Sequence, residues 1–329
     1  MKKRQIFTLL LCVALLVGTV GAAFVPQEKP QLQNSVVWGT VETIDGRTLH
    51  VKNSSDSPLN DVIIHMDENA PIIDAVSGTA LELSSVKAGQ TVYVTIGPAT
   101  TKSLPPQATG LALITNIPAD FRVPTYITID RVIASDEKGV LAEVLAADGS
   151  LKAKITEDTI ISRYVKPGDV SILSIPTVDE LKPGCGLFVW FGMSTASNTA
   201  QTTLTQCVIV PSSYDGYVDI TETTLTYDGA AVTLLDSQKS IQNAAGDTLV
   251  ALRPVAEAAG WKLTWVAKDQ PITLTKGEQT ITITLGSSDV QVGTETISLR
   301  QAARIQNATT YVDADFLMQA LNLYTTIGG

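Results

Sequence analysis

Short apolar runs that alternate with polar positions make up most of the chain. The clearest of these runs, all rich in β-branched residues, are Val36–Val41, Thr48–Val51, Val62–Met66, Thr91–Ile96 and Leu111–Ile114. Turn sequences such as Asp45-Gly46 and Asp148-Gly149 separate neighbouring runs, and Asp-Gly is a strong hairpin signal. Many short strands at this spacing predict a mainly β protein built from small barrels or sandwiches.

Two stretches of this β-rich region resemble each other. Val86–Val94 matches Leu181–Val189, and Gly110–Ile114 matches Thr205–Ile209 with the same offset of 95 residues. Self-similarity at a fixed offset indicates repeated structural units. We therefore expect β-repeat 1 at residues 36–120 and β-repeat 2 at residues 121–213. Each repeat is predicted to form a small OB-like barrel, with a shared two-sheet sandwich as the alternative.

The pattern changes after residue 213, where two stripes of apolar residues occur at helical spacing. They are Leu252, Val255, Ala256 and Ala259 in the first stripe, and Phe316, Leu317, Ala320 and Leu321 in the second. Gly260 and Asn322 follow the stripes, and both residue types tolerate the left-handed end of a helix. Asp313 is placed to cap the second helix. Residues 214–329 therefore predict an α+β domain, a β-meander with two short helices.

The first residues of the chain have a different character. Met1–Arg4 is a short basic segment, Ile6–Val20 is an apolar run, and Gly21-Ala22-Ala23 supplies small residues at its end. This order is typical of a secretory signal peptide, and the run is short for a membrane span of ~20 residues. We expect a signal peptide at 1–23 and a linker at 24–35. The mature protein would then be secreted or associated with the cell wall, with no membrane segment; an uncleaved N-terminal anchor is the alternative.

Composition narrows the class of partner. The formal net charge is −10, and removal of Lys2, Lys3 and Arg4 would take it to −13. An acidic chain repels phosphate backbones, so nucleic acid is not an expected partner. A hydrophobic content of 44 % argues for packed cores and against disorder.

The predicted mature chain keeps two cysteines, Cys185 and Cys207. Export permits disulfide formation. Leu187–Phe191 and Thr203–Val210 are expected to pair as a hairpin, which brings the two cysteines close to one register. We therefore predict a structural disulfide between them, and two buried free thiols are the alternative.

A longer signature surrounds the first predicted helix. Residues 249–261 read Leu-Val-Ala-Leu-Arg-Pro-Val-Ala-Glu-Ala-Ala-Gly-Trp, and Leu263-Thr264-Trp265 follows. On these residues, the stretch 228–324 resembles the copper amine oxidase N-terminal-like domain of secreted Firmicute proteins. The resemblance implies a stalk-like adaptor domain, apart from the catalytic domain of true copper amine oxidases. Ala251 departs from the proline usual in that family, and the second arm, Val312–Asp315, lacks the basic residues found there.

The residue types needed for catalysis form no recognisable pattern. The chain has two histidines, His50 and His65, whereas the copper site implied by the family name needs three. Neither a Gly-x-Ser-x-Gly elbow nor a phosphate-binding glycine loop occurs. Ser84 and Lys87 fit the common Ser-x-x-Lys motif, but the partner motifs of that enzyme class are absent. We therefore expect no catalytic residue, no metal and no other cofactor.

Candidate binding residues remain. The loop Thr100–Gly110, which includes Lys102 and Gln107, lies between predicted strands, and loops on rigid β-units often carry binding. Trp190 is interpreted either as a core residue or as a flat platform for a sugar ring. We expect an exported, non-catalytic binding or structural protein that recognises a cell-wall polysaccharide or another envelope protein. The alternative is a secreted hydrolase or a carbohydrate-binding protein with its site on the β-repeats.

Overall fold

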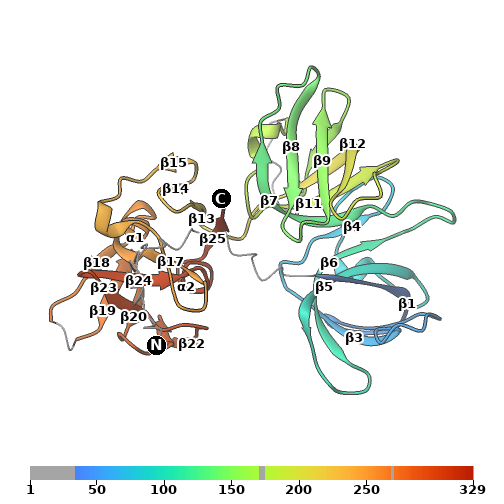
Figure 1. Cartoon of the computed structure of the whole chain (residues 1–329). Helices are drawn as coiled ribbons and strands as arrows, with labels where there is room; N and C mark the ends of the chain where they lie inside the picture. Colours follow the sequence, from blue (N-terminus) through green and yellow to red (C-terminus); the bar gives the residue numbers. More distant parts are fainter. Residues whose placement is uncertain (1–33, 170–174, 268–269, 329) are drawn as a thin grey trace, which may run out of the picture.

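The computed structural model describes residues 34–328 with gaps at 170–174 and 268–269. The predicted signal peptide and most of the predicted linker lie outside the described residues. Strands make up 48 % of the chain and helices 8 %, so the predicted mainly β class is confirmed. Figure 1 shows two β-barrels followed by a C-terminal β-rich region with two short helices. Among the residues that the structure describes, no helix has the length and apolar character needed to cross a membrane.

Barrel 1 is formed by the first six strands. They are β1 (Ser35–Asp45), β2 (Thr48–Lys52), β3 (Asp61–Met66), β4 (Ile72–Asp74), β5 (Thr91–Thr100) and β6 (Gln107–Thr115), with a 3₁₀ turn at Leu83–Ser85. Five strands follow the order β3-β2-β1-β5-β6, and a parallel pair between β3 and β6 closes the ring. Alternate side chains point inward, so that Leu49, Val51 and Ile64 lie in its core with no exposed surface.

Barrel 2 has the same arrangement. Its strands are β7 (Thr125–Ile133), β8 (Val140–Ala146), β9 (Leu151–Thr156), β10 (Ile160–Arg163), β11 (Gly186–Phe191) and β12 (Ala200–Val210), with a 3₁₀ turn at Val178–Glu180. The order is β9-β8-β7-β11-β12, and a parallel pair between β9 and β12 closes the ring. The common strand order supports the internal repeat in the sequence. A closed five-stranded Greek-key barrel is the OB-like architecture that we predicted.

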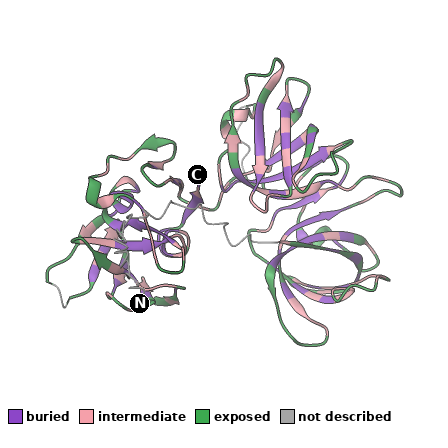
Figure 2. Cartoon of the chain, viewed as in Figure 1, coloured by how far each residue is buried: buried purple, intermediate pink, exposed green. Residues whose placement is uncertain are grey.

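The two barrels share an apolar core. Ile73, Ala75 and Ile114 of barrel 1 pack with Phe188 and Trp190 of barrel 2. Trp190 is only 8 % exposed, and its indole N–H donates to the carbonyl of Ala75 at 2.8 Å. Figure 2 shows buried residues along the strands of both barrels and exposed residues in their loops. The prediction of Trp190 as a ligand-binding residue is therefore wrong, because burial leaves no ring face for a sugar.

The C-terminal region contains three small sheets. The first joins β15 (Ala230–Ala231), β14 (Leu225–Tyr227), β13 (Gly216–Ile220) and β25 (Leu323–Ile327). The second joins β16 (Ile241–Gln242), β17 (Thr248–Ala251), β24 (Thr309–Asp313) and β23 (Arg304–Gln306). The third is a meander of β18 (Lys262–Thr264), β19 (Ile272–Lys276), β20 (Gln279–Ile283), β21 (Asp289–Val292) and β22 (Glu295–Ser298). A 3₁₀ turn occupies Asp236–Gln238.

A strand that leads directly into a short helix occurs twice in this region. The helices are α1 (Leu252–Ala258), after β17, and α2 (Ala314–Gln319), after β24. The carboxylate of Asp313 accepts a hydrogen bond from the N–H of Phe316 at 3.0 Å, so the predicted cap is confirmed. Gly260 and Asn322 adopt φ values of +81° and +53° after the two helices, which confirms the predicted left-handed positions.

Asn322 also ties the C-terminal region to the connection from barrel 2. Its side-chain amide donates to the carbonyl of Ser213 at 3.0 Å and to the carboxylate of Asp215 at 3.2 Å. The neighbouring rings of Tyr214 and Tyr324 meet edge to face, with centroids 5.4 Å apart. The connection is therefore packed against the region that follows it.

Candidate functional site

The loop before the last strand has the same sequence pattern in each barrel. It runs from Thr101 to Gln107 in barrel 1 and from Thr195 to Gln201 in barrel 2, and both read Thr-x-Ser-x-x-x-Gln. We call these segments the twin loops. In OB-like barrels this loop and the adjacent face of the second and third strands form the usual surface for oligosaccharides and oligonucleotides.

Four hydrogen bonds recur at equivalent atoms of the twin loops. The Thr hydroxyl bonds the Ser hydroxyl, at 2.7 Å in barrel 1 and 2.8 Å in barrel 2. It also accepts from the Gln N–H, at 2.8 and 2.9 Å. The Thr N–H donates to the Gln carbonyl at 3.0 Å in both loops, and the Ser hydroxyl donates to a carbonyl two residues on. Because only backbone atoms of Gln take part, its side-chain amide can make other contacts.

In barrel 1 this amide lies against strands β2 and β3. The Oε1 atom of Gln107 is 3.0 Å from Nε2 of His65, and Nδ1 of His65 is 3.1 Å from the hydroxyl of Thr48. An amide oxygen can only accept, so Nε2 of His65 is the donor to Gln107. Its two ring nitrogens thus hold His65 in a fixed orientation at the base of the loop.

A second polar pair lies on the same two strands. His50 on β2 and Asp61 on β3 are joined by a 2.6 Å hydrogen bond between Nε2 and Oδ1. This bond, with the nearby charge of Lys52, holds the pKa of Asp61 below its usual value. The face of barrel 1 beside its twin loop is thus lined by imidazole, carboxylate, amide and hydroxyl groups.

The equivalent face of barrel 2 carries different chemistry. Gln201 lines a hollow of about 300 Å³ with Lys152, Lys154 and Glu143. Lys152 forms a 2.5 Å ion pair with Glu143. The ammonium group of Lys154 donates a hydrogen bond to the carboxylate of Glu137, which raises the pKa of Lys154. By strand register, Lys154 takes the place of His65 in barrel 2, Lys152 that of Ile63, and Leu145 that of His50.

The predicted binding residues divide between these places. Lys102 and Gln107 both lie on the first twin loop, where Lys102 is exposed. Trp190 lies in the core between the barrels. Sequence reasoning missed Gln201, although the recurrence of Thr-x-Ser-x-x-x-Gln 94 residues further along the chain could have revealed it.

The predicted disulfide is absent, because Cys185 and Cys207 are free thiols, both buried. Cys207 on β12 lies opposite Val189, whereas Gly186, the neighbour of Cys185, lies opposite Val210. The cysteines are therefore offset by four residues along the strands, about 13 Å at the usual rise, which is too far for an S–S bond. Burial raises the pKa of the Cys207 thiol to about 12.

The described residues show no assembled reaction centre of a familiar kind. No group of three or more His, Cys, Asp or Glu side chains gathers there to hold a metal ion. His50 and His65 bond an aspartate, an amide and a threonine, and no serine or cysteine stands beside either ring in the described hydrogen bonds. The fold and these faces define a modular, β-rich protein with two OB-like barrels.

Comparison with known proteins identifies the C-terminal third. Residues 226–327 match the family of the copper amine oxidase N-terminal domain, which confirms the resemblance seen in the sequence. The match covers only this non-catalytic domain and not the catalytic domain of copper amine oxidases. No curated protein matches the chain.

Proposed function

We propose that the chain is an exported, non-catalytic binding protein of the extracellular space or cell wall, in which each barrel holds a segment of polysaccharide. The recurrence of one hydrogen-bonded loop at the same place in both barrels carries this proposal. In OB-like folds that place borders the ligand surface. The C-terminal domain would act as a stalk-like adaptor.

The chemistry of the face of barrel 1 favours sugars over nucleic acids. Amide, hydroxyl and imidazole groups around Gln107 can bond sugar hydroxyls in both directions. The net charge of −10 opposes binding of a phosphate backbone. Two like sites on one chain also suit a ligand that repeats along its length, because a repeating polymer can engage both.

The stoichiometry of binding tests this function. The full chain is first retained on immobilised peptidoglycan and cell-wall polysaccharides, and a retained polymer is then cut into short oligosaccharides for titration calorimetry. We expect Gln107→Ala or Gln201→Ala to bind at one site fewer than the parent chain, and the double variant at two sites fewer. Gln279→Ala, an exposed position on β20 of the C-terminal domain, serves as the matched control and should keep both sites.

Two results would contradict the proposed function. One is the absence of retention on every polysaccharide, and the other is unchanged stoichiometry in the double variant. Export is tested by the intact mass of protein recovered outside the producing cells, which should lack residues 1–23. Turnover of a panel of glycosides, esters or peptides by the purified chain would favour the alternative of a secreted hydrolase.

A further inference from the structure

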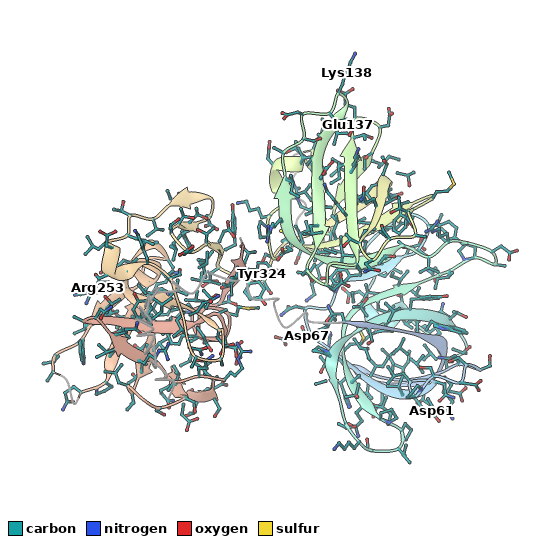
Figure 3. The ribbon with its side chains drawn as sticks, viewed as in Figure 1. Asp61, Asp67, Glu137, Lys138, Arg253 and Tyr324 are labelled. Carbon is teal, nitrogen blue, oxygen red and sulfur yellow. The ribbon has the colours of Figure 1, made fainter. Side chains whose placement is uncertain are left out.

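A cleft of about 700 Å³ lies where the two barrels meet the start and end of the C-terminal region. It is lined from barrel 1 by Asp67 and Asn69, from barrel 2 by Tyr126 and Asp148, and from the C-terminal side by Tyr324. In Figure 3, Asp67 and Tyr324 lie on facing sides of the centre of the molecule. None of the residues that line the cleft belongs to the twin loops.

Aromatic rings form one part of the lining. Tyr214 and Tyr324 meet edge to face, and Tyr126 lies over Gly186, where a Cβ atom would collide with its phenolic oxygen. Gly184 likewise leaves space for Tyr324, because a Cβ there would lie 3.0 Å from the Cβ of that tyrosine. No hydrogen bond within the described residues uses the hydroxyl of Tyr126, which lines the cleft. The glycines therefore seat the rings, and at least one phenol remains able to bond a ligand.

Carboxylates form the other part of the lining. Oδ1 of Asp67 accepts from the N–H of Asn69 at 2.8 Å. Oδ1 of Asp148 accepts from the N–H and the hydroxyl of Ser150, at 2.9 and 2.6 Å. Each carboxylate is thus held in place through one oxygen, and its Oδ2 is used by no hydrogen bond among the described residues. Arg47 bonds the backbone carbonyl of Asp67 from outside the cleft, and no Lys, Arg or His lines the cleft itself, so the charged side chains of its lining are acidic and favour a cation.

We propose that this cleft binds an oligomer of amino sugars whose amino groups are free and therefore positively charged. The half-buried rings of Tyr126 and Tyr214 combine an apolar face with a polar tip and suit the faces of pyranose rings. Tyr324 is 5 % exposed and packs against Tyr214 as its support. The side chains of Asn69 and Ser150 can bond sugar hydroxyls. The unused oxygens of Asp67 and Asp148 can each accept from an ammonium group in a charge-assisted hydrogen bond. A neutral, N-acetylated sugar lacks the charge that these two carboxylates require.

Titration calorimetry on the Gln107→Ala/Gln201→Ala chain isolates the cleft from the twin loops. The probes are a glucosamine hexamer, its fully N-acetylated counterpart and hexalysine. We expect the glucosamine hexamer to bind at one site, at least ten-fold more tightly than either other probe, and to weaken as salt is added. Equal or tighter binding of the N-acetylated hexamer or of hexalysine would overturn the proposed ligand class.

Variants then test the two carboxylates. Asp67→Asn and Asp148→Asn keep an oxygen that can accept the same backbone N–H, so the local turns should persist. Each substitution is expected to weaken binding of the glucosamine hexamer by about five-fold, as for a partly exposed ion pair. Glu257→Gln is the control, since that carboxylate pairs with Arg253, far from the cleft in Figure 3. If the Asp67→Asn/Asp148→Asn variant binds the glucosamine hexamer as tightly as the control, the proposed cleft site is refuted. This outcome is independent of whether the twin loops bind polysaccharide.

Discussion

Truncation of Trp190 is expected to separate the two barrels without unfolding either one. The ring packs with Phe188 and Val208 on its own barrel and with Ile73 and Ala75 on the other, outside both barrel interiors. Its N–H is the donor to the buried carbonyl of Ala75. Loss of the side chain therefore removes both apolar packing and a hydrogen bond from the surface that joins the barrels.

The magnitude follows from these two contributions. Replacement of a buried tryptophan by alanine costs about 3–5 kcal/mol, because it leaves a cavity and removes apolar contacts. Trp190→Phe retains much of the ring but leaves the carbonyl of Ala75 without its donor, which costs about 1–3 kcal/mol. Trp265 gives a matched control, since it is 37 % exposed and its N–H also donates to a carbonyl, that of Gln270. Trp265→Phe should stay within about 0.5 kcal/mol of the parent.

Urea unfolding followed by far-ultraviolet circular dichroism measures these effects. The parent barrels should unfold together, whereas Trp190→Ala should resolve them into two transitions of smaller slope, since each then exposes less surface. Trp190→Phe should lower the shared midpoint without splitting it. A single transition in Trp190→Ala, displaced no further than in Trp265→Ala, would refute the view that Trp190 couples the barrels.

Other residues give shorter tests. Gly184→Ala should lower the free energy of unfolding by about 1–3 kcal/mol, because the added Cβ crowds Tyr324, and it should speed proteolysis of residues 210–216. Gly89→Ala is the control, because Gly89 has the same φ of +85° and nothing lies within 4 Å of its added Cβ. Burial raises the pKa of Asp313, so the folded state binds this proton more tightly than the unfolded state. The contribution of Asp313 to stability should therefore fall as pH rises above the ordinary pKa of an aspartate. Asp313→Asn keeps the helix cap but cannot titrate, so this contribution should be absent when its stability is measured by urea unfolding at several pH values. If the stability of the parent rises more with pH than that of Asp313→Asn, the raised pKa of Asp313 is contradicted. The Cys207 thiol, whose pKa is raised to about 12, should resist alkylation by iodoacetamide until the protein unfolds. A disulfide-linked peptide pair containing Cys185 and Cys207 in mass spectra would contradict two free thiols.

Local patterns predicted the strands well, but not the contacts between distant segments. Alternation along Val62–Met66 identifies a strand with one buried face, and β3 occupies this place. No local pattern signals that β3 closes the barrel by pairing in parallel with β6, where Ile63 lies opposite Gln107. The cysteines show the same limit. The sequence predicts the hairpin of β11 and β12, but the strand register decides whether a disulfide can form. The hairpin contains a register shift between Trp190 and Phe191 that no local pattern signals.

The twin loops show which residues of a repeated loop a sequence comparison can detect. Thr, Ser and Gln recur because their hydroxyls and backbone build the loop, whereas Lys102 in one loop is alanine in the other. The neighbours of the glutamine side chains differ more. Gln107 is paired in the sheet with Ile63 and bonds His65, but Gln201 is paired with Lys152. If each barrel binds a segment of polysaccharide, as we propose, the shared scaffold with different neighbouring charges predicts the same class of sugar at unequal affinity. A titration that resolves two sites of different strength is therefore the result expected from this duplication.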